Sequence, residues 1–397
     1  MIRVSEKPAV SGGKPTFDHM VPIVRPPIKD RIDMILTDYK RILESGMITN
    51  FEYVRKLEKA VASFIGVDHC VTTASGTLGL MLALKALNIR KGKVLIPSFT
   101  FPATAHAARW NNLAIELVDC DTETFNLDPE DLKEKITDKC KAVVPVHVFG
   151  NPCDIDAISE IAADHELKVI FDSAHAFGAE YKNKKVGRFG DAEVFSGSPT
   201  KVFTTVEGGL VTTNRAEIAE KVGIGRNYGH HGNYNCEISG LSARMSELHA
   251  AVGLNVLPYV ASGIERRNEI AKEYRRGLGK LPGVRFQKTT AKSLSACKDF
   301  AILIDESRFG LHRDELAASL GKENIMTRKY FYPPLHMQDC YPELKASKKD
   351  LPNTDLVANN ILCLPIFSGL NDEQVSGIID AIIRIHSHAD EVKQSFD

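Results

Sequence analysis

Hydrophobic positions near the start of the chain recur with the spacing of amphipathic helices. Over residues 31–43 the apolar side chains lie three or four positions apart, and the same spacing returns over residues 54–65. The pattern predicts two helices, with apolar positions Ile32, Ile35, Leu36, Tyr39 and Ile42 in the first and Val54, Leu57, Val61, Phe64 and Ile65 in the second. Before them, Ser11-Gly12-Gly13 and Pro26-Pro27 predict that residues 1–27 form an extended arm rather than packed structure.

After Gly66 the pattern changes to short apolar runs that alternate with helical patterns such as residues 155–165. This alternation is typical of βαβ units and predicts a mostly parallel sheet over residues 67–255. The predicted strands are residues 94–96, 115–118, 142–146, 169–171, 194–195 and 210–212. In such sheets ligands bind at the carboxyl ends of the strands. Ser75, Phe101, Asp172 and Lys201 all fall at or just after the end of a predicted strand.

The last third of the chain has a different order of elements. A long helix over residues 245–278 leads to an apolar strand over residues 300–304 and to helices over residues 312–320 and 372–385. The sequence therefore predicts an α/β protein with an extended arm (1–27), a large domain (28–255) and a smaller α+β domain (256–397).

Charge and length limit the class of partner. The chain has 397 residues, 43% of them hydrophobic, and its 50 basic and 51 acidic residues leave a net charge of −1. No long block of like charge is present, so neither nucleic acid nor an anionic membrane is the expected partner. A small-molecule ligand is expected instead.

The cysteines and the N-terminal residues indicate a reducing compartment. Eight cysteines are scattered without a CxxC pair, so we expect free thiols and no metal site. The first residues contain no apolar segment typical of a signal peptide, and no apolar run approaches transmembrane length. These features predict a cytoplasmic protein.

Ser75-Gly76-Thr77 stands between a predicted strand and a predicted helix. Free backbone N–H groups and the positive end of the helix dipole favour a phosphate at such a position, and glycine allows close approach. The alternative is an ordinary N-cap, with Ser75 or Thr77 capping the helix. By itself this turn does not decide between the two.

Asp172 ends an apolar run, where an unpaired carboxylate would be costly. A protonated pyridine nitrogen is a suitable partner, and holding that proton keeps the ring an electron sink. A helix cap or a salt bridge is the alternative. His175, three residues later, could contact the same ligand or could be a structural histidine.

Lys201 lies between two predicted strands, five residues after Ser196. A buried lysine beside a cationic cofactor has a lowered pKa and can attack an aldehyde as the neutral amine. Ser196 would then bind a phosphate and Phe101 would lie flat on a pyridine ring, unless Phe101 is simply part of the core. Amine, hydroxyl and buried acid together fit a pyridoxal phosphate (PLP) site.

Five motifs in order carry a resemblance to a known family: ASGT, IPSFTFPAT, FDSAHAFGA, FSGSPTK followed by EGG, and ARMSELHAAVGL. Together they resemble the DegT/DnrJ/EryC1/StrS family of fold-type-I PLP enzymes, the sugar aminotransferases. The similarity extends from the helix before Gly66 to Pro334-Leu335-His336. It implies a mostly parallel central sheet flanked by helices, with a smaller α+β C-terminal domain.

The resemblance also implies roles at matching positions. Lys201 would form the Schiff base with PLP and later shuttle a proton, Asp172 would pair with the pyridinium nitrogen, and His175 would approach the 3′-oxygen. Phe101 would stack on the ring. The phosphate would be held by Gly76, Thr77 and Ser196. Because family members are typically homodimers with active sites at the interface, part of each site should come from the partner subunit.

Some positions depart from the family pattern. The family's asparagine before the MSE-like segment, which reaches the phosphate of the neighbouring subunit, is absent from Gly240-Leu241-Ser242-Ala243-Arg244. Ser242, Arg244 and Asn227 are the candidates to substitute for it, and the sequence does not choose between them. Ser198 stands where the family often has histidine, and Glu52 replaces an expected glycine.

The predicted reaction moves an amino group from an amino acid, with glutamate favoured, through a pyridoxamine phosphate form to a nucleotide-linked keto-sugar. Tyr332 and His336 are the predicted sugar-site residues. A cyclitol or other keto substrate, and a non-catalytic regulatory protein, are the alternatives. The 3-dehydratase branch of the family has histidine in place of the lysine, so Lys201 argues against it.

Overall fold

The computed structural model describes residues 6–345 and 350–396 of the chain. Its centre is a seven-stranded sheet in the order β1-β9-β8-β5-β4-β2-β3. Every strand of this sheet is parallel to the others except β9, which pairs antiparallel with both of its neighbours. The strands are β1 (His69–Thr73), β2 (Lys93–Pro97), β3 (Ala114–Val118), β4 (Cys140–Val143), β5 (Lys168–Asp172), β8 (Ala192–Ser196) and β9 (Gly209–Thr213). The predicted mostly parallel sheet is confirmed.

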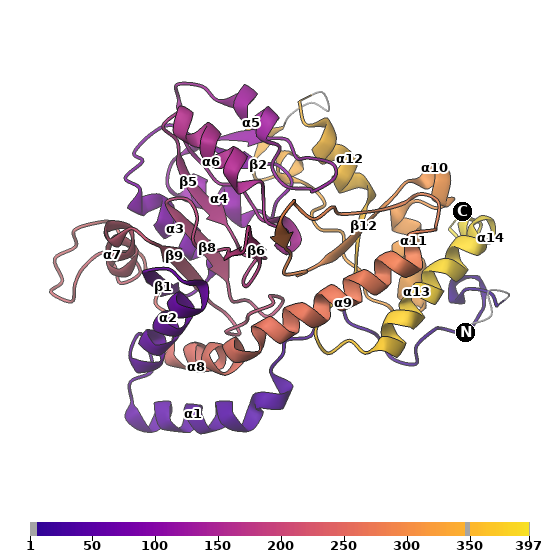
Figure 1. Ribbon diagram of the computed structural model, residues 1–397, viewed down its shortest axis with the longest axis horizontal. Coiled ribbons are helices and arrows are strands. Elements are labelled where there is room, and N and C mark those ends of the chain that lie inside the picture. The colour runs from indigo at the N-terminus through magenta and orange to yellow at the C-terminus, as the bar shows by residue number, and fades with distance from the viewer. Residues whose placement is uncertain (1–5, 346–349, 397) are drawn as a thin grey trace.

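Helices cover both faces of this sheet (Figure 1). Along β2, Val94 and Ile96 point into the core beneath α3, α4 and α7, whereas Leu95 points to the other face, which α5 and α6 cover. Because successive side chains of a strand point to opposite faces of the sheet, one apolar run contributes residues to both cores. The covering helices are α3 (Gly76–Ala86), α4 (Ala103–Trp110), α5 (Pro129–Lys135), α6 (Ile155–Asp164) and α7 (Ala216–Gly225).

A third core lies under the N-terminal helices. The two predicted amphipathic helices are present as α1 (Ile32–Ser45) and α2 (Glu52–Ile65), and both pack against α8 (Glu247–Val256). The prediction of a single helix over residues 245–278 was wrong, because a 3-10 turn (Leu257–Tyr259) separates α8 from α9 (Val260–Leu278). Pro258 in this turn has no N–H to donate and its ring obstructs the preceding turn of a helix.

The remaining part of the chain forms a second sheet with its own core. Its three strands are antiparallel in the order β10-β12-β13. The elements are β10 (Val284–Phe286), β12 (Phe300–Ile304), β13 (Ile361–Leu364), α10 (Glu306–Phe309), α11 (Arg313–Lys322), α12 (Pro352–Asn360), α13 (Asp372–Ser387) and α14 (Ala389–Lys393). A small sheet of β6 (Glu180–Tyr181), β7 (Lys184–Lys185) and β11 (Ser293–Leu294) joins the two parts of the chain. The predicted domain limits stay predictions.

The N-terminal segment is packed, against expectation. The buried carboxylate of Glu323 accepts hydrogen bonds from the backbone N–H groups of Ala9 and Thr16, each at 2.8 Å, and pairs with Arg384 at 2.6 Å. Val21 is buried and pairs with Ile325. These contacts fix the segment against the C-terminal part of the chain. Among the described residues no helix is both long and apolar enough to cross a membrane.

Candidate active site

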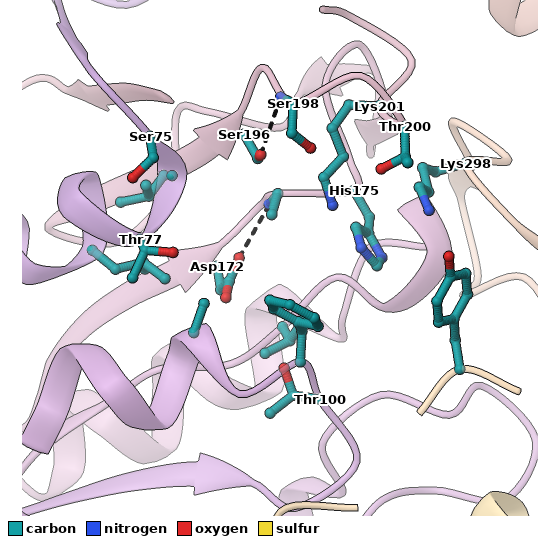
Figure 2. A pocket seen from close by; sticks show the side chains of 18 of the residues that line it. Ser75, Thr77, Thr100, Asp172, His175, Ser196, Ser198, Thr200, Lys201 and Lys298 are labelled. Atoms are coloured by element: carbon teal, nitrogen blue, oxygen red, sulfur yellow. Dashed lines mark hydrogen bonds between the residues drawn. The ribbon is translucent and has the colours of Figure 1, made fainter. Parts of the chain in front are cut away.

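Strand ends of the central sheet lead into a cavity of about 390 Å³. The turns after β1, β2, β5 and β8 all contribute to its wall, as expected where parallel strands end at one edge of a sheet. The predicted residues that line this cavity are Gly76, Thr77, Phe101, Asp172, His175, Ser196 and Lys201. Figure 2 shows the side chains of Thr77, Asp172, His175, Ser196 and Lys201 around this space.

The N-terminus of α3 forms one side of the cavity. Ser75 is the N-cap, and its side chain accepts a hydrogen bond from the N–H of Leu78 at 3.2 Å. A Cβ at Gly76 would lie 3.1 Å from the Cβ of Ser196, so glycine lets the start of α3 approach the end of β8. The structure thus shows the N-cap, which is Ser75. Gly76, Thr77 and Ser196 lie together at the same helix N-terminus, a position suited to a phosphate, and their phosphate-binding role stays a prediction.

Asp172 is buried at the end of β5. Its Oδ2 accepts a hydrogen bond from the Thr104 hydroxyl at 2.8 Å, and its Oδ1 accepts one from the N–H of Ala174 at 3.1 Å. Burial raises the pKa of Asp172, although both hydrogen bonds oppose this. No salt-bridge partner is found for Asp172 within the described part of the chain. A cationic ligand nitrogen would supply the missing positive charge.

His175 follows on the same turn and lies beside two aromatic rings. Its Nδ1 accepts a hydrogen bond from the N–H of Phe149 at 3.3 Å, and its ring stacks with Phe149 and Phe331. Burial, and then the positive charges of Lys201 and Lys298, holds the pKa of His175 well below its usual range. His175 is therefore neutral, with its proton on Nε2.

Lys201 lies in the loop between β8 and β9. Burial, followed by the positive charge of Lys298, lowers the pKa of Lys201 to about 7. The amine is then partly neutral near neutral pH, which is the form that attacks a carbonyl carbon. Ser198 also lines the cavity, and its N–H donates to the Ser196 hydroxyl at 3.4 Å.

Phe101 precedes α4 and is 58% exposed although its side chain is apolar. It lines the cavity, so it is not a core residue. An aromatic ring open to the cavity is available to stack on a flat ligand.

Other predicted residues lie outside the cavity wall. His336 is buried, with Nδ1 2.8 Å from the Ser98 hydroxyl and Nε2 3.1 Å from Asp355 Oδ1, so both ring nitrogens have partners within the chain. Tyr332 packs under the guanidinium of Arg313, 4.6 Å from the ring centroid. The structure does not bring either one to the cavity, and their sugar-binding role stays a prediction.

Asn227, Ser242 and Arg244 form a cluster of their own. Arg244 donates to the side-chain oxygen of Asn227 at 2.9 Å, and Asn227 pairs with Ser242 in an isolated bridge. None of the three lines the cavity of the same chain.

The cavity also contains residues that the sequence pattern did not predict. Lys298 and Tyr330 come from the C-terminal part of the chain and line the cavity, and Thr104 supports Asp172 from α4. The only sequence signal for Lys298 is a charged pair, Lys298-Asp299, directly before the apolar run of β12. The described residues contain no cluster of three or more His, Cys, Asp or Glu placed to hold a metal ion.

Comparisons with known proteins agree with this arrangement. Residues 30–383 match the DegT/DnrJ/EryC1/StrS aminotransferase family. The dTDP-4-amino-4,6-dideoxy-D-glucose transaminase of Shigella dysenteriae is 38% identical over 83% of this chain and 89% of its own length.

Two solved structures are also similar. The structure of DesI in the presence of its TDP-sugar product has a TM-score of 0.90 and 33% identity, and the alignment covers 97% of this chain and 98% of that one. The structure of S. venezuelae DesV in complex with a ketimine intermediate has a TM-score of 0.88 and 30% identity, covering 93% of this chain and 99% of that one.

The residues of the cavity fit PLP. The buried Asp172 carboxylate, which forms no ion pair with any described residue, suits the pyridine nitrogen, and the α3 N-terminus with Ser196 suits the phosphate. Lys201, with its lowered pKa, lines the same cavity.

Proposed function

The chain belongs to the DegT/DnrJ/EryC1/StrS aminotransferase family, and on that premise we propose that it moves an amino group from an amino acid, with glutamate favoured, to a nucleotide-linked keto-sugar. The protein is a PLP-dependent aminotransferase. The observation that carries the proposal is the convergence of Lys201, Asp172 and the α3 N-terminus on one cavity.

The proposed roles follow from the position of each side chain. When bound, PLP supplies an electron sink for the carbon that loses its proton. Lys201 would hold the cofactor through Nζ and, when free, would carry the proton to and from the substrate carbon. Asp172 would hold a proton on the ring nitrogen. His175 would offer its Nε2–H to the ring oxygen, and Gly76, Thr77 and Ser196 would hold the phosphate.

We also propose a homodimer, which the exposed face of α1 supports. Ile32, Leu36 and Leu43 of this helix are 48%, 57% and 61% exposed, although Ile35 and Ile42 on its other face are buried. An apolar helix face of this kind is typical of a protein interface. One of Arg244, Asn227 and Ser242, which lie outside the cavity of their own chain, would then reach the phosphate of the partner's site.

Replacement of the lysine tests the mechanism. Lys201→Ala should lower turnover by at least about 100-fold, because the variant loses both the attachment point and the proton carrier. Borohydride reduction of the wild type should fix the cofactor to the peptide that contains Lys201, as read by mass spectrometry. Lys139→Ala, at an exposed position, is the matched control. Full turnover in Lys201→Ala would contradict the proposed mechanism.

A substrate screen tests the proposed acceptor. Nucleotide-linked keto-sugars and cyclitol ketones are offered with glutamate, and the aminated product is identified by mass spectrometry. Amino-sugar formation is the expected result. Amination of a cyclitol alone would favour the alternative substrate, and PLP binding without turnover of any ketone would favour a regulatory role.

A further inference from the structure

A second lysine in the cavity has no role in the mechanism above. Lys298 lies just before β12, lines the cavity and is only 4% exposed. Its Nζ donates to both carboxylate oxygens of Asp299, each at 2.9 Å, and lies 5.0 Å from the centroid of the Tyr330 ring. The ammonium group is therefore held in one place.

A buried ion pair of this kind is costly for the fold. Each ion is costly to take out of water, and the attraction between the two charges offsets this cost only with good geometry. An ammonium group has three N–H donors, and Asp299 accepts two of them. One donor is left for a ligand, at a fixed position in the cavity wall.

The position of Lys298 limits which ligand group it can meet. Figure 2 shows Lys298 beyond His175 and Thr200, on the opposite side of the cavity from Ser75 and Thr77. Lys298 is also near enough to Lys201 for its charge to lower the pKa of that amine. Apart from Lys201 itself, Lys298 is the only lysine or arginine among the described residues that line this cavity.

The two substrates differ in where their negative charge lies. An amino-acid donor carries its α-carboxylate on the reacting carbon, whose proton Lys201 must reach. In a nucleotide-linked keto-sugar the diphosphate is attached at the anomeric carbon, so the sugar ring separates it from the ketone. A fixed cation close to Lys201 therefore suits the donor carboxylate better than the diphosphate.

We propose that Lys298, held in place by Asp299, binds the α-carboxylate of the amino donor. This inference rests on the proposed function and adds the residue that selects an α-amino acid over a simple amine. A charge-assisted hydrogen bond to a carboxylate is consistent with a selectivity of about 10- to 100-fold.

The test compares two amino donors, of which only one has an α-carboxylate. L-Glutamate and 4-aminobutyrate share an amine and a side-chain carboxylate, but 4-aminobutyrate lacks the α-carboxylate. The wild-type holoenzyme should show a KM for glutamate about 10- to 100-fold below the KM or inhibition constant of 4-aminobutyrate. In Lys298→Met this preference should shrink to less than about threefold, whereas Lys280→Met, at an exposed position, should keep it.

Two further variants separate the loss of the Lys298 charge from a general loss of the fold. Lys298→Met leaves Asp299 buried without its partner, so the double variant Lys298→Met, Asp299→Leu removes both charges together. Lys298→Arg keeps the charge and can still pair with both oxygens of Asp299, so it should keep most of the preference.

Binding without turnover is measured by calorimetric titration of the holoenzyme with α-methyl-L-glutamate, which has no α-proton to lose. Its Kd should rise about 10- to 100-fold in both Met variants.

The outcomes separate this inference from the proposed function. If the wild type aminates no ketone with any amino acid, the proposed function fails. If the wild type is active but does not prefer glutamate over 4-aminobutyrate, or the Met variants keep the preference, only the inference about Lys298 is overturned. It is also overturned if the loss of Lys298 raises the KM of the keto-sugar nucleotide instead of that of glutamate.

Discussion

The pKa values of Lys201 and His175 are both lowered in this structure, and burial is the largest cause in each case. Removal from water disfavours the charged form of an amine or an imidazole, and the charge of Lys298 acts in the same direction on both. The amine thereby becomes a nucleophile near neutral pH. The imidazole becomes a neutral donor, because its Nδ1 already accepts from Phe149.

The lowered pKa of Lys201 predicts a pH dependence. The amine is protonated below its pKa, so the rate at which cofactor-free protein takes up PLP should fall as the pH drops through about 7. Lys298→Met removes a positive neighbour, so the pKa of Lys201 should rise and the midpoint should move to higher pH. Stopped-flow absorbance of the PLP band measures the rate.

Lys280→Met is the control for this experiment and should leave the midpoint in place. A wild-type midpoint near the ordinary lysine pKa of about 10.4 would show that Lys201 is not held in a desolvated site.

At the scale of elements, the phosphate cradle depends on how closely α3 approaches β8. Gly76 is at the contact, where a Cβ would lie 3.1 Å from the Cβ and 3.3 Å from the Cα of Ser196. The sequence shows a glycine at the turn, but the reason for it lies in β8, some 120 residues later along the chain. The close approach of the two elements therefore explains why this position has no side chain.

Gly76→Ala should therefore push the start of α3 away from β8. We expect a loss of about 1–3 kcal/mol in the free energy of unfolding, typical of an overpacked contact, together with a weaker Kd for PLP. Gly223→Ala in α7 is the matched control, because nothing lies within 4 Å of the place that a Cβ would take there. That control should stabilise the protein by about 0.5–1 kcal/mol. Denaturant unfolding and PLP titration measure both effects.

At the scale of the whole molecule, α1 lies along one edge (Figure 1). Its apolar side chains Ile32, Leu36 and Leu43 are exposed. Contacts with α8 bury the opposite face of the helix. A single chain thus leaves Leu36 and Leu43 in water, where a second copy of the chain would cover them.

The double variant Leu36→Glu, Leu43→Glu should therefore shift the protein toward monomer, because two charges would be buried in the interface. Sedimentation velocity at several protein concentrations measures the change. Leu356→Glu, at an apolar position of α12 that is 42% exposed, is the matched control and should leave the oligomeric state unchanged. A monomeric wild type would contradict the proposed homodimer.

The sequence by itself determined the mostly parallel sheet, the order of its strands along the chain, and the residues at or just after the strand ends: Ser75, Phe101, Asp172 and Lys201. Local patterns suffice for these, because alternation of strand and helix places every such end at the same edge of the sheet. The resemblance of the five motifs supplied the family and its cofactor.

Only the tertiary structure decided which residues from distant segments meet at that edge. Thr104 reaches Asp172 from another element, and Lys298 enters the cavity from the C-terminal part of the chain. His336 has both nitrogens bound within the chain instead. These contacts join residues far apart along the chain. They depend on how the separate cores pack against one another, and the local spacing of apolar residues carries no information about that packing. The chemistry of Lys201 itself depends on that packing, because its pKa is lowered by burial and by a lysine almost one hundred residues away.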